Sequence, residues 1–181
     1  MFPWICYRWL TSYSEKMNYI FRNATEDDTE QLRQLGLNSY GQFESILTEE
    51  NWTRLKTNLL AENLYSDLLK KGVCFVCVTA EAVIGMAFLI PNGNPTEIFP
   101  AEYCYLRMVG VHTGFSGKGI GRKLTQLCID HAKASGEQRM ALHTAEFMDS
   151  ARHIYESVGF IKTRELKQML GKKYWFYTLE L

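Results

Sequence analysis

The chain has 181 residues, enough for one domain with a sizeable hydrophobic core and too few for two domains of ordinary size. Hydrophobic residues make up 46% of the chain and charged residues 22%, which is typical of a soluble globular protein. Twenty basic and twenty acidic side chains balance to a net charge of +0, which argues against nucleic acid as the main partner. No apolar run approaches the length that crosses a membrane. We therefore expect a cytoplasmic protein with neither nucleic-acid nor membrane partners.

The first 16 residues, "MFPWICYRWLTSYSEK", are rich in aromatic residues and are interrupted by Arg8. They lack the continuous apolar stretch of a signal peptide. The first convincing strand, "NYIFRNA", begins directly after Met17. We therefore expect residues 1–16 to be an extension, either native or arising from an upstream start codon. Residues 17–181 are expected to form a single domain.

Two helical segments are predicted after the first strand. In "RNATEDDTEQLRQLGL", Thr25 can cap the helix, and Leu32 and Leu35 recur on one face. Residues 51–70 are predicted to form a second helix, because Trp52 and four leucines recur at helical spacing. The segment between the two helices, "NSYGQFESILTE", is poorly periodic.

Strands dominate the rest of the chain, with two further helices. "VCFVCVT" and "AVIGMAFLI" predict a hairpin, the proline-rich "PNGNPTEIFPAE" a loop, and "YCYLRMVGV" a buried central strand. A glycine-rich stretch then opens a helix, and "RMALHTA" predicts the next strand. "DSARHIYESVGF" predicts a short helix that ends at Gly159, and "FIKTREL" and "KYWFYTLEL" close the chain. This element order describes one mixed α/β domain.

The cysteines give no sign of a metal site. Cys74 and Cys77 form a C-x-x-C pair, but they lie in a predicted strand, where residues three apart face opposite sides of the sheet. They therefore cannot hold one ion together, and no second cluster of cysteine and histidine accompanies them. We expect no metal, and reduced cysteines that pack as small apolar side chains.

The glycine-rich stretch "GFSGKGIGRKL", residues 114–124, predicts an anion site. Glycines allow the backbone to approach a ligand closely, the first amides of a helix are unpaired, and Lys118, Arg122 and Lys123 add positive charge. The register does not fit G-x-x-x-x-G-K-S/T, because His112 stands where the first glycine belongs. It does not fit G-x-G-x-x-G either. The anion is therefore bound by another kind of motif.

Two segments resemble motifs of the GNAT acyltransferase superfamily. Residues 116–121, "SGKGIG", are similar to its cofactor-binding motif R/Q-x-x-G-x-G/A, and "DSARHIYESVGF" is similar to its second signature. The resemblance implies the GNAT fold, a mixed and mostly antiparallel central sheet flanked by helices. Ser116 and Met148 depart from the usual pattern, since relatives often have arginine or glutamine at the first position and asparagine at the second. The resemblance implies acetyl-CoA as the acyl donor, bound by Val109, Val111, Gly117, Lys118, Gly119, Ile120, Gly121, Arg122 and the segment at Met148.

Transfer of an acyl group to an amine requires a group that protonates the leaving thiolate and a group that deprotonates the amine. Tyr155 matches the tyrosine that many relatives use as the general acid. His143 matches a position where some relatives carry a glutamate base, and an ordinary imidazole pKa near 6.5 suits this role. Glu102 is a second candidate base, and a chain of water molecules is a third alternative.

Arg107 is an unusual residue for an apolar central strand, where an unpaired charge is costly. It can form a buried salt bridge or bind the acceptor, and a guanidinium suits a carboxylate. The loop at residues 91–101 and the segment at residues 38–48 are expected to form walls of the acceptor pocket.

The resemblance implies an acyl-CoA-dependent N-acyltransferase, most simply an acetyltransferase in which the amine attacks directly. The rival interpretation is a catalytically weak CoA-binding sensor or partner-binding module on the same fold. The acceptor stays open between a small-molecule amine and a protein N-terminus, and the acyl chain length is open too. A homodimer is compatible with the family, although no residue pattern indicates one.

Overall fold

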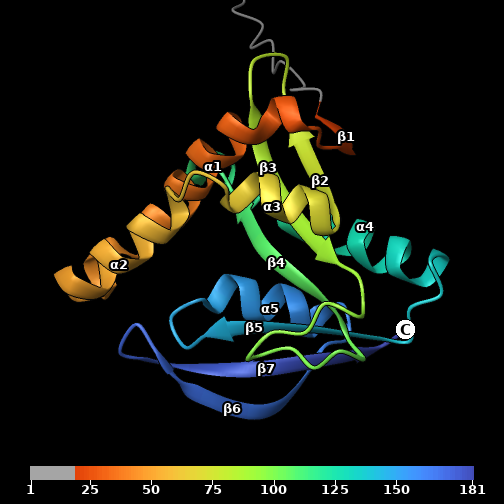
Figure 1. Cartoon of the computed structure of the whole chain (residues 1–181). Coiled ribbons are helices and arrows are strands. Elements are labelled where there is room, and N and C mark those ends of the chain that lie inside the picture. The colour runs from red at the N-terminus through yellow and green to blue at the C-terminus, as the bar shows by residue number, and fades with distance from the viewer. Residues whose placement is uncertain (1–18) are drawn as a thin grey trace, which may run out of the picture.

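The computed structural model describes residues 19–181, and the expected extension at residues 1–16 lies outside this range (Figure 1). One seven-stranded sheet has the order β1-β2-β3-β4-β5-β7-β6. Neighbouring strands are antiparallel, except that β4 and β5 run parallel. The strands are β1 (Ile20–Asn23), β2 (Val73–Val78), β3 (Val83–Ile90), β4 (Cys104–Val111), β5 (Arg139–Ala145), β6 (Ile161–Met169) and β7 (Lys172–Glu180).

The described chain has five α-helices, one more than the sequence predicts. The helix expected at residues 51–70 is two helices, because the chain turns at residues 60–63, where the N–H of Leu64 donates to the carbonyl of Ala61 at 3.2 Å. The turn lets Tyr65 and Leu68 pack on the sheet, while the preceding helix extends away from it (Figure 1). The helices are α1 (Thr29–Gly41), α2 (Glu49–Leu59), α3 (Leu64–Lys71), α4 (Ile120–Ala134) and α5 (Asp149–Ser157).

Each face of the sheet has its own hydrophobic core. Helices α4 and α5 cover one face, where Leu124, Cys128 and Tyr155 pack against the strands. Helices α1 and α3 cover the other face. Cys77 belongs to the first core and Cys74 to the second, so the prediction that this pair faces opposite sides of the sheet is confirmed.

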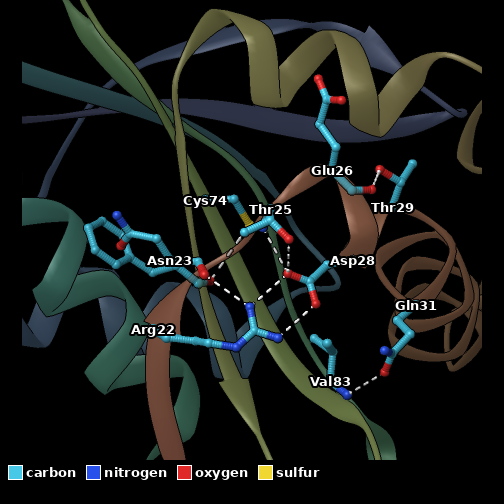
Figure 2. Close-up of polar contacts among 10 residues, drawn as sticks. Arg22, Asn23, Thr25, Glu26, Asp28, Thr29, Gln31, Cys74 and Val83 are labelled. Carbon is cyan, nitrogen blue, oxygen red and sulfur yellow. Dashed lines mark hydrogen bonds and ion pairs between the residues drawn. The ribbon is translucent and has the colours of Figure 1, made fainter.

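A salt bridge between Arg22 and Asp28 links β1 to the start of α1 (Figure 2). Both terminal nitrogens of Arg22 donate to the Asp28 carboxylate at 2.7 Å, and the backbone N–H of Thr25 donates to it at 2.8 Å. Hydrogen bonding from Arg22 is the main reason that the pKa of Asp28 is lowered. Further along, the N–H of Val83 donates to the side chain of Gln31 at 3.0 Å. These contacts hold α1 in place over the sheet.

The parallel strands β4 and β5 separate after a short stretch of pairing. Cys104 lies opposite Met140, and Tyr105 lies opposite Ala141, but the register extends no further. The backbone of β4 is irregular here, since Met108 has a φ of 52° and the register with β3 shifts between Met86 and Phe88. The two strands therefore splay apart and open a gap in the middle of the sheet.

Candidate active site

A cleft of about 1540 Å³ occupies the gap between β4 and β5. It has two halves, which we name by their most distinctive residues. The glycine half is lined by Val109, Val111, residues from 115–122 and residues from α5. The arginine half is lined by residues from α1, α2 and the β6–β7 hairpin, together with Arg107 and His143. One cleft thus joins the glycine-rich loop to the helices on the other face of the sheet.

Backbone conformation shapes the loop in the glycine half. Gly117 and Gly119 have φ values of 74° and 76°, a left-handed conformation that other residues adopt at a cost. A β-carbon added at either position would meet no protein atom within 4 Å, so both glycines border open space. Helix α4 begins at Ile120, and the first N–H groups of a helix have no partner within it. The loop therefore presents free backbone donors to the cleft, which suits an anion.

The cations of the loop differ in their placement. Arg122 lines the cleft, whereas Lys118 does not, and the Lys118 ammonium lies over the Phe115 ring at 5.1 Å from its centroid. Met148 also lines the cleft, and its sulfur accepts a hydrogen bond from the Thr144 hydroxyl at 3.7 Å. Of the side chains predicted to bind the cofactor, Lys118 alone is not among the residues that line the cleft.

Tyr155 reaches the cleft from α5, on the same side as the glycine-rich loop. Its side chain is buried and packs edge-on against Phe160, with ring centroids 6.0 Å apart. Burial raises the pKa of its phenol, and Tyr40 on α1 adds to this effect. Tyr155 therefore stays protonated at neutral pH and can donate a proton.

His143 lies on β5 in the arginine half, between the rings of Phe99 and Tyr174. Burial, followed by the charge of Arg107, lowers its pKa to about 4. The expectation of an ordinary pKa near 6.5 is therefore wrong, because the imidazolium would be desolvated beside a cation. The buried Nδ1 atom has no hydrogen-bond partner among residues 19–181. His143 is thus a neutral imidazole with an unused ring nitrogen.

Arg107 is half-buried on β4 and lines the cleft. It forms no ion pair within the described part of the chain, so the buried salt bridge considered from the sequence is absent there. Its charge is close enough to Tyr40 to lower the pKa of that phenol, against the larger effect of burial, which raises it. The guanidinium is therefore available to a ligand of the arginine half.

Besides Lys118, two further predicted parts of the site do not line the cleft. Glu102 is exposed in the turn before β4, beyond the Cys104–Met140 pairing and so at the opposite end of the strand from the splay. The loop at residues 91–101 contributes no lining residue, because Phe99 is buried and stacks on Tyr105 with ring centroids 4.1 Å apart. Phe99 packs into the second core, and the loop forms no wall of the pocket.

The cleft also contains residues that the sequence did not single out. Arg54 lies on α2, Phe147 follows β5, and Tyr174 lies on β7. The turn between β6 and β7 approaches α2 so closely that a β-carbon at Gly171 would lie 3.1 Å from the side-chain nitrogen of Asn51. No local motif marks these residues, because tertiary packing brings them together.

Residues 19–181 show neither a cluster of metal ligands nor a membrane-spanning helix. Among residues 19–181, no three metal-ligating side chains of histidine, cysteine, aspartate or glutamate gather in one place. No helix within that range has both the length and the apolar character needed to span a bilayer.

Known proteins resemble this chain in sequence and in fold. An uncharacterized N-acetyltransferase, YdgE of Bacillus subtilis, is 22% identical over 152 residues, which cover 81% of this chain and 94% of that protein. The PaiA N-acetyltransferase of Thermoplasma acidophilum, solved with coenzyme A, superposes with a TM-score of 0.74 at 14% identity, covering 91% of this chain and 100% of that one.

A second solved structure is yncA, a putative acetyltransferase of Salmonella typhimurium, with its cofactor acetyl-CoA. It has a TM-score of 0.65 at 20% identity and covers 90% of this chain and 94% of its own. These likenesses confirm the predicted fold. The family model of the acetyltransferase (GNAT) family matches residues 29–160, well over half of the sequence. The chain therefore belongs to the GNAT acetyltransferase family.

Proposed function

We propose that this protein transfers an acetyl group from acetyl-CoA to an amine, by direct attack of the amine on the thioester. The observation that carries the proposal is the continuous cleft through the splayed strands. One half of the cleft offers free backbone donors for a phosphate-bearing donor, and the other half is walled by side chains that can bind an acceptor. The two halves meet in the gap between β4 and β5.

The residues of the glycine half fit the donor. A diphosphate suits the free N–H groups at the start of α4, with Gly117 and Gly119 leaving room and Arg122 adding charge. The extended pantetheine arm carries amide groups, and β4 beyond Tyr105 has no pairing with β5, so Val109 and Val111 can pair with the arm as a strand would. Lys118, whose ammonium lies over the Phe115 ring, is left out of this assignment.

Tyr155 and His143 have complementary proton roles in this proposal. Acetyl-CoA supplies an activated thioester carbonyl. His143, neutral at physiological pH, accepts a proton from the attacking amine, directly or through water, while the bond from nitrogen to the acyl carbon forms. Tyr155 gives its proton to the departing sulfur as the C–S bond breaks. The acceptor attacks as the free amine, its ammonium proton having first passed to solvent. The amine then loses one proton and the thiolate gains one, so the transfer is balanced.

The low basicity of His143 limits its role. Because burial and Arg107 disfavour its imidazolium, His143 holds a proton only transiently and passes it on to water. We do not assign the base role to Glu102, which is not among the residues that line the cleft. We therefore assign the base function to His143 together with water.

A screen for release of free coenzyme A thiol tests this function. Purified protein is mixed with acetyl-CoA and a panel of amines, namely free amino acids, polyamines, aminoglycosides and peptides with a free N-terminus. At least one class should release thiol in step with formation of the acetylated amine, measured by mass spectrometry. Tight acetyl-CoA binding without turnover of any amine would instead favour the CoA-binding sensor, which the departures at Ser116 and Met148 keep as the alternative.

A further inference from the structure

The charges lining the cleft are unbalanced. Among the described lining residues, Asp149 is the only acidic one, and it already forms an ion pair with Arg152. Arg54, Arg107 and Lys167 line the arginine half and are opposed by no free carboxylate of the cleft. Such a pocket attracts an anionic ligand and repels a polycation. Polyamines are therefore poor candidates for the acceptor.

Arg107 is the cation that most needs a partner. A half-buried guanidinium loses hydration, and the loss is normally offset by a carboxylate. Arg22 has such a carboxylate partner, because its two terminal nitrogens each lie 2.7 Å from an oxygen of Asp28. Arg107 has no equivalent carboxylate within residues 19–181, although it lies on the central strand β4 beside the splay. The missing partner is best supplied by the acceptor itself.

A row of contacting aromatic side chains lines the same cleft as this cation. Tyr40 and Phe43 have ring centroids 6.3 Å apart, Phe43 and Phe147 4.9 Å, and Phe147 and Tyr174 6.3 Å. The row ends at His143, whose ring centroid is 5.9 Å from that of Tyr174. Aromatic surfaces of this kind bind large apolar groups, and edge-on geometry adds to the stabilisation. Further apolar side chains extend the surface, namely Ile46, Leu55, Leu59, Met169 and Leu170.

We propose that the acceptor is a free amino acid with a large apolar or aromatic side chain. Its carboxylate binds Arg107, its side chain packs on the row of Tyr40, Phe43, Phe147 and Tyr174, and its amine faces His143. The assignment rests on the N-acetyltransferase function proposed above and names the substrate class of that site. A protein N-terminus fits less well, because its carboxylate has been replaced by a peptide bond.

Matched acceptors test the proposal in the wild-type protein. Initial rates of thiol release are measured with phenylalanine, phenylalaninamide, phenethylamine and glycine at saturating acetyl-CoA. Phenylalanine should have the highest kcat/KM. In the two analogues that lack the carboxylate, kcat/KM should be about 10- to 100-fold lower, which is the usual contribution of a charged hydrogen-bonded pair. Glycine, which keeps the carboxylate and lacks the ring, should also be a poor acceptor.

Variants then assign the selectivity to Arg107. In Arg107→Met the ratio of kcat/KM for phenylalanine over phenylalaninamide should fall to about one. Arg107→Lys should keep part of the wild-type ratio, because the ammonium keeps the positive charge but cannot donate two parallel hydrogen bonds to the carboxylate. Arg139→Met is the matched control, since Arg139 is a half-buried arginine on β5 that stacks on Tyr103 outside the cleft. That variant should keep the wild-type ratio.

The outcomes separate this proposal from the function on which it rests. Equal rates for phenylalanine and its amide in the wild type would overturn the proposed acceptor class, even if Arg107→Met failed to fold. An unchanged ratio in a folded Arg107→Met would overturn the assignment to Arg107. Turnover of a polyamine or a peptide in place of amino acids would overturn the proposed acceptor class and leave the transferase function intact. Failure of every amine, with no binding of acetyl-CoA, would overturn the transferase function.

Discussion

The two halves of the cleft are built in different ways. The glycine half takes its backbone donors from one continuous segment, residues 115–122, where Gly117 and Gly119 have positive φ values. The arginine half uses side chains from α1, α2, β4, β5 and β7, which are far apart in the sequence. The proposed donor site in the glycine half is therefore fixed by local backbone conformation, whereas the proposed acceptor site in the arginine half depends on tertiary packing. Changes to each half should therefore affect different measured quantities.

The largest loss of activity is expected on changing Tyr155, which lines the cleft from α5. Tyr155→Phe keeps the ring in its core and removes only the proton donor, so kcat should fall by about 100-fold while the affinity for acetyl-CoA changes little. Steady-state rates and calorimetric titration measure the two quantities.

The matched control is Tyr177→Phe. Tyr177 is a buried tyrosine of the same core, and its hydroxyl is 2.9 Å from the Glu156 carboxylate, outside the cleft. This variant should lose stability of about 1 kcal/mol and keep its kcat. Wild-type kcat in Tyr155→Phe would show that water protonates the thiolate and would remove Tyr155 from the mechanism.

In the arginine half, His143 should make stability depend on pH. The unfolded chain binds a proton at this histidine near pH 6.5, whereas the folded chain binds it only near pH 4. The unfolded state therefore binds more protons between these values, and the free energy of unfolding should fall as the pH decreases from 6.5 to 4. Denaturant titrations should show a loss on the order of 2 kcal/mol that is absent in His143→Gln.

The same histidine should set the acidic limb of activity. The Tyr174 ring from β7 lies 5.9 Å from the His143 ring, centroid to centroid, and the charge of Arg107 from β4 lowers the pKa of His143 in addition to burial. The limb of kcat/KM that reports the free enzyme should therefore lie near pH 4 in the wild type and move upward in Arg107→Met. A wild-type limb between pH 6 and 7 that survives in His143→Gln would exclude His143 as the base.

A smaller change, in the affinity for acetyl-CoA, is expected from substitutions in the glycine half. Gly119→Ala adds one β-carbon that faces the open space proposed for the diphosphate, so acetyl-CoA should bind about tenfold more weakly. Gly136→Ala is a matched control, because Gly136 has a φ of 81°, has equally open surroundings and lies just beyond the other end of α4. Both variants carry similar backbone strain. Equal affinities in the two would show that the loop does not hold the donor.

The same contrast explains how much could be predicted from the sequence. The strands, the order of most elements and the loop at Gly117 and Gly119 follow from local patterns of alternation, capping and glycine placement. The break between α2 and α3 could not be seen, because the leucine spacing continues across it while the chain direction changes. The lowered pKa of His143 was also inaccessible, since burial and the proximity of Arg107 arise only when β4 and β5 are adjacent.

Direct titration of acetyl-CoA into the wild-type protein tests the central claim, that the glycine half is an acyl-CoA site. We expect binding of one molecule per chain and a rise in Tm, since a ligand at 100 times its Kd stabilises a protein by about 2.7 kcal/mol. The affinity should weaken in Gly119→Ala and stay unchanged in Gly136→Ala. Neither heat of binding nor a shift in Tm with acetyl-CoA or longer acyl-CoAs would contradict the account.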